Sequence, residues 1–140
     1  SVLSKLSELL FIEVVRYYTE NLPADAKGWL AALVEPRISR ALQLLHGRPE
    51  QPWTLDSLAR ESGSSKTVLV NLFRDHLDTA PMAYLNNWRM QLASRLLVES
   101  RSNIANIAVK VGYESEAAFS RRFKHCTGES PGAWRVMQSA

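Results

Sequence analysis

Apolar residues recur along the chain at spacings of three and four positions, which is the period of an amphipathic α-helix. No segment shows the strict alternation of apolar and polar residues that predicts a half-buried β-strand. The pattern predicts helices over residues 3–20, 36–46, 55–62, 66–77, 81–98, 104–111 and 116–125, with short ones near 29–33 and after 131. We therefore predict an all-α protein.

Residues typical of helix ends stand at the expected boundaries. Ser, Thr or Asn just before a helix accepts a hydrogen bond from a backbone N–H of the first turn. The predicted caps are Thr54, Ser65, Asn103 and Ser115. Pro81 fits the first turn of the longest helix. The apolar positions of that helix, expected to be buried, are Tyr84, Leu85, Trp88, Leu92 and Leu96.

The chain also carries an internal repeat, in which Gly112 follows Gly63 by 49 residues and Pro131 follows Pro81 by 50. Its first copy reads Leu55, Leu58, Ala59, Gly63, Ser65, Leu69, Phe73, Pro81, Tyr84, and its second reads Ile104, Ile107, Ala108, Gly112, Ser115, Phe119, Phe123, Pro131, Trp134. Each copy predicts a short helix, a glycine turn, a second helix and a closing helix opened by proline. This is a helix-turn-helix unit, whose second helix commonly enters the major groove of DNA. Two helices around a glycine also occur in proteins that bind no DNA, but a tandem match is far more specific.

The formal net charge is only +3, and its distribution is more informative than its size. Residues 1–46 hold five basic and five acidic groups, and residues 47–100 hold six of each. Residues 101–140 hold six basic groups against three acidic ones, so the whole excess lies in the second copy of the repeat. A local basic surface is typical of a protein that binds a polyanion.

Several classes of protein are excluded by what the sequence lacks. It contains no run of eighteen apolar residues, and residues 1–11 lack the charged start and the small-residue cleavage site of a signal peptide, so we expect no membrane contact. A single cysteine, Cys126, rules out an internal disulfide framework and indicates the reducing cytoplasm; we expect it to be buried as a small apolar side chain. The three histidines lack carboxylates at metal-ligand spacing, and no phosphate loop or nucleophile elbow is present. We therefore expect that the protein is not an enzyme and that it has no catalytic residue, metal or cofactor.

The residues of the second copy closely resemble the AraC/XylS family of bacterial transcription regulators. The resemblance covers about residues 37–135 and is strongest in IANIAVKVGYESEAAFSRRFK, residues 104–124, followed by TGESP, residues 127–131. It implies two helix-turn-helix units joined by a long linker helix, and transcriptional control through double-stranded DNA. We accordingly divide the chain into a helical connector or sensor-domain remnant over 1–35, a first unit over 36–80, a linker helix over 81–98 and a second unit over 99–140.

The resemblance also implies which positions contact DNA. Base-reading positions fall on Thr67, Val70 and Asn71 in the first unit and on Ala117, Ala118 and Arg121 in the second. DNA-backbone contacts are assigned to Ser65, Lys66, Arg74, Ser115, Arg122 and Lys124. Arg121 is long enough to reach guanine O6 and N7, although it is also spaced to pair with Glu116.

The first unit departs from the family pattern, which leaves an alternative function open. Asn71 stands where the family usually has arginine, Asp78 replaces a glycine, Ala80 a serine and Ser64 an apolar residue. The alternative is that only the second unit binds DNA, while the first contacts RNA polymerase or another regulator. Many family members also carry a sensor domain that binds a small-molecule effector and dimerises, and in this protein an effector or a homodimer would depend on such a domain. Residues 1–35 would otherwise simply pack against the helix that follows.

Overall fold

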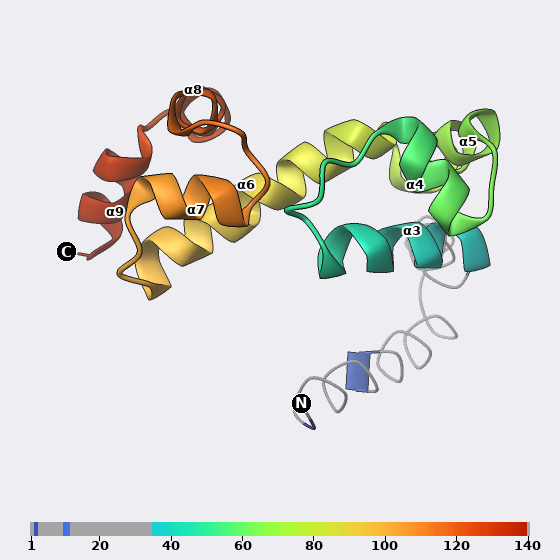
Figure 1. Cartoon of the computed structure of the whole chain (residues 1–140), viewed down its shortest axis with the longest axis horizontal. Helices are drawn as coiled ribbons and strands as arrows, with labels where there is room; N and C mark the ends of the chain where they lie inside the picture. The colour runs from blue at the N-terminus through green and yellow to red at the C-terminus, as the bar shows by residue number, and fades with distance from the viewer. Residues whose placement is uncertain (1, 3–9, 12–34, 140) are drawn as a thin grey trace.

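A computed structural model describes residues 2, 10–11 and 35–139 of the chain, and these residues form helices and turns without a β-strand (Figure 1). The helices are α3 (Pro36–Gly47), α4 (Leu55–Ser62), α5 (Lys66–Leu77), α6 (Pro81–Glu99), α7 (Ile104–Lys110), α8 (Glu116–Thr127) and α9 (Pro131–Ser139). The prediction of an all-α chain with two helix-turn-helix units and a long linker helix is confirmed. The predictions for residues 1–34 fall almost entirely outside the described residues.

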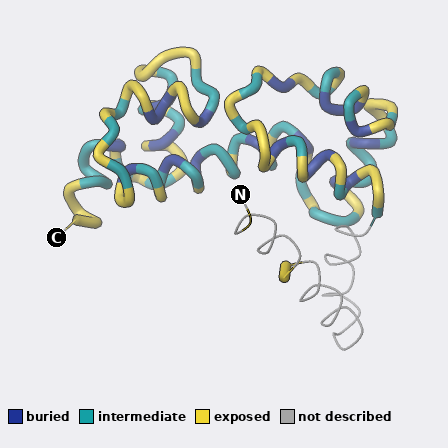
Figure 2. Tube along the Cα trace, turned by 60° about the horizontal axis from the view of Figure 1, so that its bottom comes forward, coloured by how far each residue is buried: buried dark blue, intermediate teal, exposed yellow. Residues whose placement is uncertain are grey.

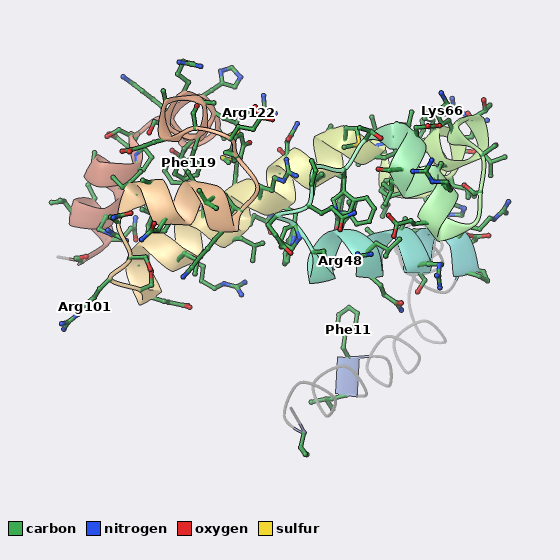
Figure 3. The ribbon with its side chains drawn as sticks, viewed as in Figure 1. Phe11, Arg48, Lys66, Arg101, Phe119 and Arg122 are labelled. Atoms are coloured by element: carbon green, nitrogen blue, oxygen red, sulfur yellow. The ribbon has the colours of Figure 1, made fainter. Side chains whose placement is uncertain are left out.

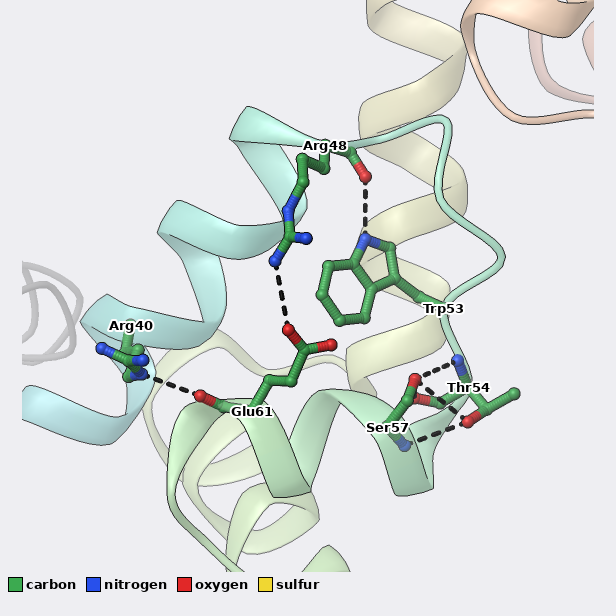
Figure 4. A network of polar contacts seen from close by, with 6 residues as sticks. All are labelled: Arg40, Arg48, Trp53, Thr54, Ser57 and Glu61. Carbon is green, nitrogen blue, oxygen red and sulfur yellow. Dashed lines mark hydrogen bonds and ion pairs between the residues drawn. The ribbon is translucent and has the colours of Figure 1, made fainter.

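The predicted caps form the predicted hydrogen bonds. Thr54 begins α4 with a reciprocal pair, in which the Ser57 backbone N–H donates to Thr54 Oγ1 at 3.0 Å and the Thr54 N–H donates to Ser57 Oγ at 3.0 Å (Figure 4). The side chains of Ser65, Asn103 and Ser115 likewise accept from the backbone N–H three residues further on. These local bonds explain why the helix starts follow directly from the sequence.

Each of the two units has its own hydrophobic core (Figure 2). The first core includes Ile38, Ala41, Leu42, Leu45, Trp53, Leu58, Ala59, Leu69, Phe73 and Leu85. The second includes Met90, Ala93, Leu97, Ile107, Ala108, Val111, Phe119 and Phe123. Helix α6 contributes to both cores, so it closes the first unit and begins the second.

This double role corrects the predicted apolar stripe of α6. Of the five side chains expected inside, only Leu85 is fully buried, whereas Tyr84, Trp88, Leu92 and Leu96 are partly exposed. Met90, Ala93 and Leu97 are buried instead. A single-stripe pattern assumes one buried face, and α6 turns different faces to two cores.

Two smaller expectations also need correction. Cys126 is exposed and not buried, because it lies in the last turn of α8, beyond the point where Phe123 ends the second core. Gly47, expected to stop the helix after residue 46, is the last residue of α3, and α6 and α8 likewise run one or two residues past their expected ends. No helix in the described part of the chain is long and apolar enough to cross a membrane.

Candidate nucleic-acid interface

The second helix of the first unit, α5, packs one side against the first core and exposes the opposite side to solvent. Leu69 and Phe73, one turn apart, are fully buried in the first core. The opposite side of α5 carries the predicted DNA contacts. Ser65, Lys66, Thr67 and Arg74 are exposed, and Val70 and Asn71 are partly exposed. The structure therefore brings all six of these residues to one accessible face (Figure 3 labels Lys66).

Helix α8 repeats this arrangement in the second unit. Phe119 and Phe123 are fully buried at the same spacing, and their rings pack with centroids 5.7 Å apart. The outer side carries the predicted contacts of this unit. Ser115, Ala117, Arg121 and Lys124 are exposed, and Ala118 and Arg122 are partly exposed.

Arg121 forms no ion pair with Glu116 or with any other residue that the structure describes, so its guanidinium is available to a ligand. Lys66, on the first unit, lies 3.8 Å from Asp56 in an exposed ion pair. Exposed pairs of this kind contribute little stability, so Lys66 can readily exchange Asp56 for another anion.

Arg122 differs from the other basic residues of α8, because part of its side chain is enclosed. Its Nε is buried without a hydrogen-bond partner among the described residues, as is the hydroxyl of Tyr113. Burial raises the pKa of Tyr113, while the positive charges of Arg122 and Arg89 act to lower it. In the view of Figure 3, Arg122 extends from α8 toward the first unit. Its Nε is closed to solvent, although the residue as a whole is partly exposed.

Sequence reasoning missed one residue that bears on the relation between the units. Arg89 falls within the predicted linker helix over 81–98, and the sequence analysis assigns it no role. In the structure it donates hydrogen bonds to the carbonyl oxygens of Pro49 and Gln51 from a partly buried position. The position of this cation between the buried residues Leu85 and Met90 is a signal in the sequence that Arg89 has a structural role. The sequence does not indicate its partners, because they lie about forty residues earlier in the chain. Within the described residues, His, Cys, Asp and Glu side chains do not gather in threes as a metal site requires.

The two candidate recognition helices lie at the two ends of α6 (Figure 1). With 19 residues, α6 is about 28 Å long at 1.5 Å per residue. Both helices begin with a serine cap and a set of free backbone N–H groups, which favour anions at that end. The arrangement thus offers two accessible helices on units that share one continuous 19-residue helix.

Comparisons with known proteins agree on one family. A family model described as a helix-turn-helix domain matches residues 58–137. The chain is 43% identical over 134 residues to the HTH-type transcriptional regulator AlkR of Acinetobacter baylyi, covering 96% of this chain and 44% of that protein. It is 38% identical over 130 residues to a protein of Streptomyces lividans described as an AraC-like transcription regulator, covering 93% and 43%. The chain thus spans less than half the length of these curated relatives.

A solved structure shows the same fold on DNA. The DNA-binding domain of the global transcriptional factor AdpA, in complex with a target DNA, matches with a TM-score of 0.67 and 27% identity, covering 73% of this chain and 91% of that chain. Both helix-turn-helix units and the shared α6 described above fall within a fold of this kind. The chain therefore belongs to the AraC family of transcriptional regulators and carries the two helix-turn-helix units of its DNA-binding region.

Proposed function

We propose that this chain recognises a specific sequence in double-stranded DNA by placing α5 and α8 in successive major grooves, and that it regulates transcription in this way. The observation that carries the proposal is the presence of two accessible second helices at the ends of one 19-residue helix. Successive major grooves on one side of B-DNA lie about 34 Å apart. The length of α6, about 28 Å, together with the widths of the two units, suits that spacing.

The proposal gives each base-reading residue a chemical task. Arg121 donates two hydrogen bonds to guanine O6 and N7, and Asn71 pairs with adenine. Thr67, Val70, Ala117 and Ala118 make apolar contacts with thymine methyl groups or allow the helix to approach the base edges. The second unit then reads a guanine, and the first reads mainly A·T pairs.

The remaining polar residues fix the register of the protein on the DNA backbone. Ser65 and Ser115 bring the N-termini of α5 and α8 to phosphates, where the helix dipoles favour negative charge. Charged contacts come from Lys66, Arg74, Arg122 and Lys124. Such contacts contribute affinity on any sequence and make binding sensitive to salt.

We extend the proposal to the longer protein only in outline, because the curated relatives are more than twice as long as the matched region. A small-molecule effector would act through a sensor domain outside this chain, and a homodimer would be held together there. RNA polymerase is a further candidate partner of the regulator. The proposal involves no catalytic residue, metal or cofactor, and it places the protein in the cytoplasm with its DNA target.

Selection of binding sites from a pool of random duplexes tests this proposal. We expect a consensus of two half-sites whose centres are about ten base pairs apart, one turn of the double helix. A consensus confined to a single half-site would contradict the use of both units and support the alternative, in which the first unit contacts another protein.

A further inference from the structure

The two units have separate cores, so the geometry of their connection needs its own explanation. Leu85 is the last α6 side chain in the first core, and Met90 is the first in the second core. A single helix between two rigid bodies allows some bending and twisting. Arg89 lies in this interval, and its contacts reach both units.

Arg89 binds a loop of the first unit. Its Nε donates to the carbonyl oxygen of Pro49 at 2.9 Å, and its Nη2 donates to that of Gln51 at 3.0 Å. The loop is itself fixed to the first core, because Trp53 is buried there and its indole N–H donates to the Arg48 carbonyl at 2.8 Å (Figure 4). Arg89 is therefore joined to a well-anchored part of the first unit.

The same guanidinium touches the second unit. Its central carbon lies 5.9 Å from the ring centroid of Tyr113, within the range of a cation–π contact. The Tyr113 ring packs in turn on Phe119 of α8, with centroids 5.7 Å apart. A continuous chain of contacts thus runs from the first-unit loop through Arg89 to the second recognition helix.

The backbone of the second unit at Gly112 also packs closely against Arg89 and the first-unit loop. A β-carbon built on Gly112 would lie 2.6 Å from the Pro49 carbonyl oxygen and 2.9 Å from the Arg89 guanidinium. Gly112 belongs to the turn between α7 and α8, so a second-unit turn packs directly against a first-unit loop. Burial lowers the pKa of Arg89, and the nearby groups of Tyr113 and Glu50 oppose that effect and favour the charged form.

Arg135 offers an internal comparison. From α9 it donates to the carbonyl oxygen of Leu97, near the end of α6, at 2.8 Å, and to that of Ser102, in the connection between α6 and α7, at 2.7 Å. In each unit, an arginine of the closing helix thus supports the loop before the first helix of the helix-turn-helix. All the described hydrogen bonds of Arg135 lie within the second unit and its half of α6, whereas Arg89 also contacts the neighbouring unit.

We propose that Arg89 is a positioning residue that fixes the distance and rotation between α5 and α8, and thereby makes this regulator selective for one spacing between its two half-sites. The inference rests on the proposed function for its DNA aspect, and on the contacts of Arg89 for its structural aspect. Inserting one base pair moves the half-sites by about 3.4 Å and turns them by about 35°. A rigid pair of units cannot follow that change, whereas a loosened pair can.

Binding to a series of spacings tests the DNA aspect. The probe is the duplex selected from the random pool, with zero, one or two base pairs inserted between its half-sites. For the unsubstituted chain we expect one insertion to weaken binding by more than about tenfold, because two linked contacts become one. For Arg89→Met we expect weaker binding to the original duplex and a penalty for insertion below about threefold, since the second contact can re-form. Arg89→Lys, which can serve only one carbonyl oxygen well, should fall between them.

Arg135→Met is the matched control, since it removes the corresponding arginine without touching the contact between units. It is expected to lower the melting temperature yet keep the full penalty for insertion. An Arg89→Met protein that melts cooperatively and keeps the full penalty would overturn the inference.

A measurement without DNA separates this inference from the proposed function. Cys126, the single cysteine of the chain, is exposed on α8, and Asp75 is exposed on α5. Spin labels at Cys126 and at Asp75→Cys would report the distances between the two recognition helices. We expect one narrow distribution of label-to-label distances for the labelled protein that keeps both arginines and for its Arg135→Met variant. For the Arg89→Met variant we expect a broader or shifted distribution. Identical distributions in all three would refute the positioning role, even if the chain binds DNA as proposed.

Discussion

Gly112 lies against the carbonyl oxygen of Pro49, which belongs to a loop more than sixty residues earlier in the chain. Its φ of +98° already disfavours any side chain, and a β-carbon would also come within 2.6 Å of that oxygen. We predict that Gly112→Val lowers the free energy of unfolding by about 3 kcal/mol, as backbone strain and a steric clash add. Thermal melting followed by circular dichroism measures this change.

Gly63 provides the control that separates the steric clash from the backbone strain, when alanine is placed at each of the two glycines in turn. It has a φ of +78° in the equivalent turn of the first unit, but no atom beyond Gly63 and its two chain neighbours lies within 4 Å of the position that a β-carbon would take there. Alanine at Gly63 should therefore cost only the left-handed strain, about 1 kcal/mol. If Gly63→Ala and Gly112→Ala lowered the melting temperature equally, the close packing at Gly112 would have no energetic consequence.

Asp78 ends α5 in a left-handed conformation, with φ +54°, where the second unit has Gly128 at φ +85°. Among the described residues it is the one non-glycine with positive φ. We predict that Asp78→Gly stabilises the protein by about 1 kcal/mol, because a glycine adopts this conformation without strain. The reverse change, Gly128→Asp, should destabilise by a similar amount. A lower melting temperature for Asp78→Gly would show that the Asp78 side chain makes a compensating contact.

Arg121→Ala should weaken binding to the selected duplex by about 1–3 kcal/mol, the range for one bidentate contact with a base. The reason is that Arg121 is exposed, unpaired with any described residue, and the only long hydrogen-bonding side chain among the assigned base-reading positions of α8. Titrations on the selected duplex and on random duplexes provide the test. Equal losses on both would place Arg121 among the phosphate contacts.

The two units should contribute unequally to binding. We predict that alanine at Val70 and Asn71 costs less affinity than alanine at Arg121 and Arg122, since no arginine stands at the base-reading positions of α5. Removing Lys124 should reduce the slope of log K against log salt by about 1, as expected for one phosphate contact. A selected consensus that is strongest under the first unit would contradict this order.

The features that sequence reasoning predicted correctly are those that depend on neighbours in the chain. The caps at Thr54 and Ser115 and the left-handed turn at Gly63 each need only a few consecutive residues. The open faces of α5 and α8 followed from the spacing of Leu69, Phe73, Phe119 and Phe123, which fixes what points inward.

The features that it missed depend on pairings distant in the sequence. Nothing near Arg89 indicates that Pro49 will accept its hydrogen bond, and nothing near Gly112 indicates that the same carbonyl will exclude a side chain. The burial of Met90 in place of Trp88 likewise follows from the presence of two cores along one helix. The assignment of individual DNA contacts stays a prediction, because each contact depends on the DNA sequence as well as on the protein.

Hydroxyl-radical footprinting on the selected duplex tests the central claim, that both helix-turn-helix units bind one face of DNA together. We predict two protected regions about ten base pairs apart on the same face, with protection beneath α5 weaker than beneath α8. Protection of a single groove by the folded chain, unchanged by Asn71→Ala and abolished by Arg121→Ala, would contradict it.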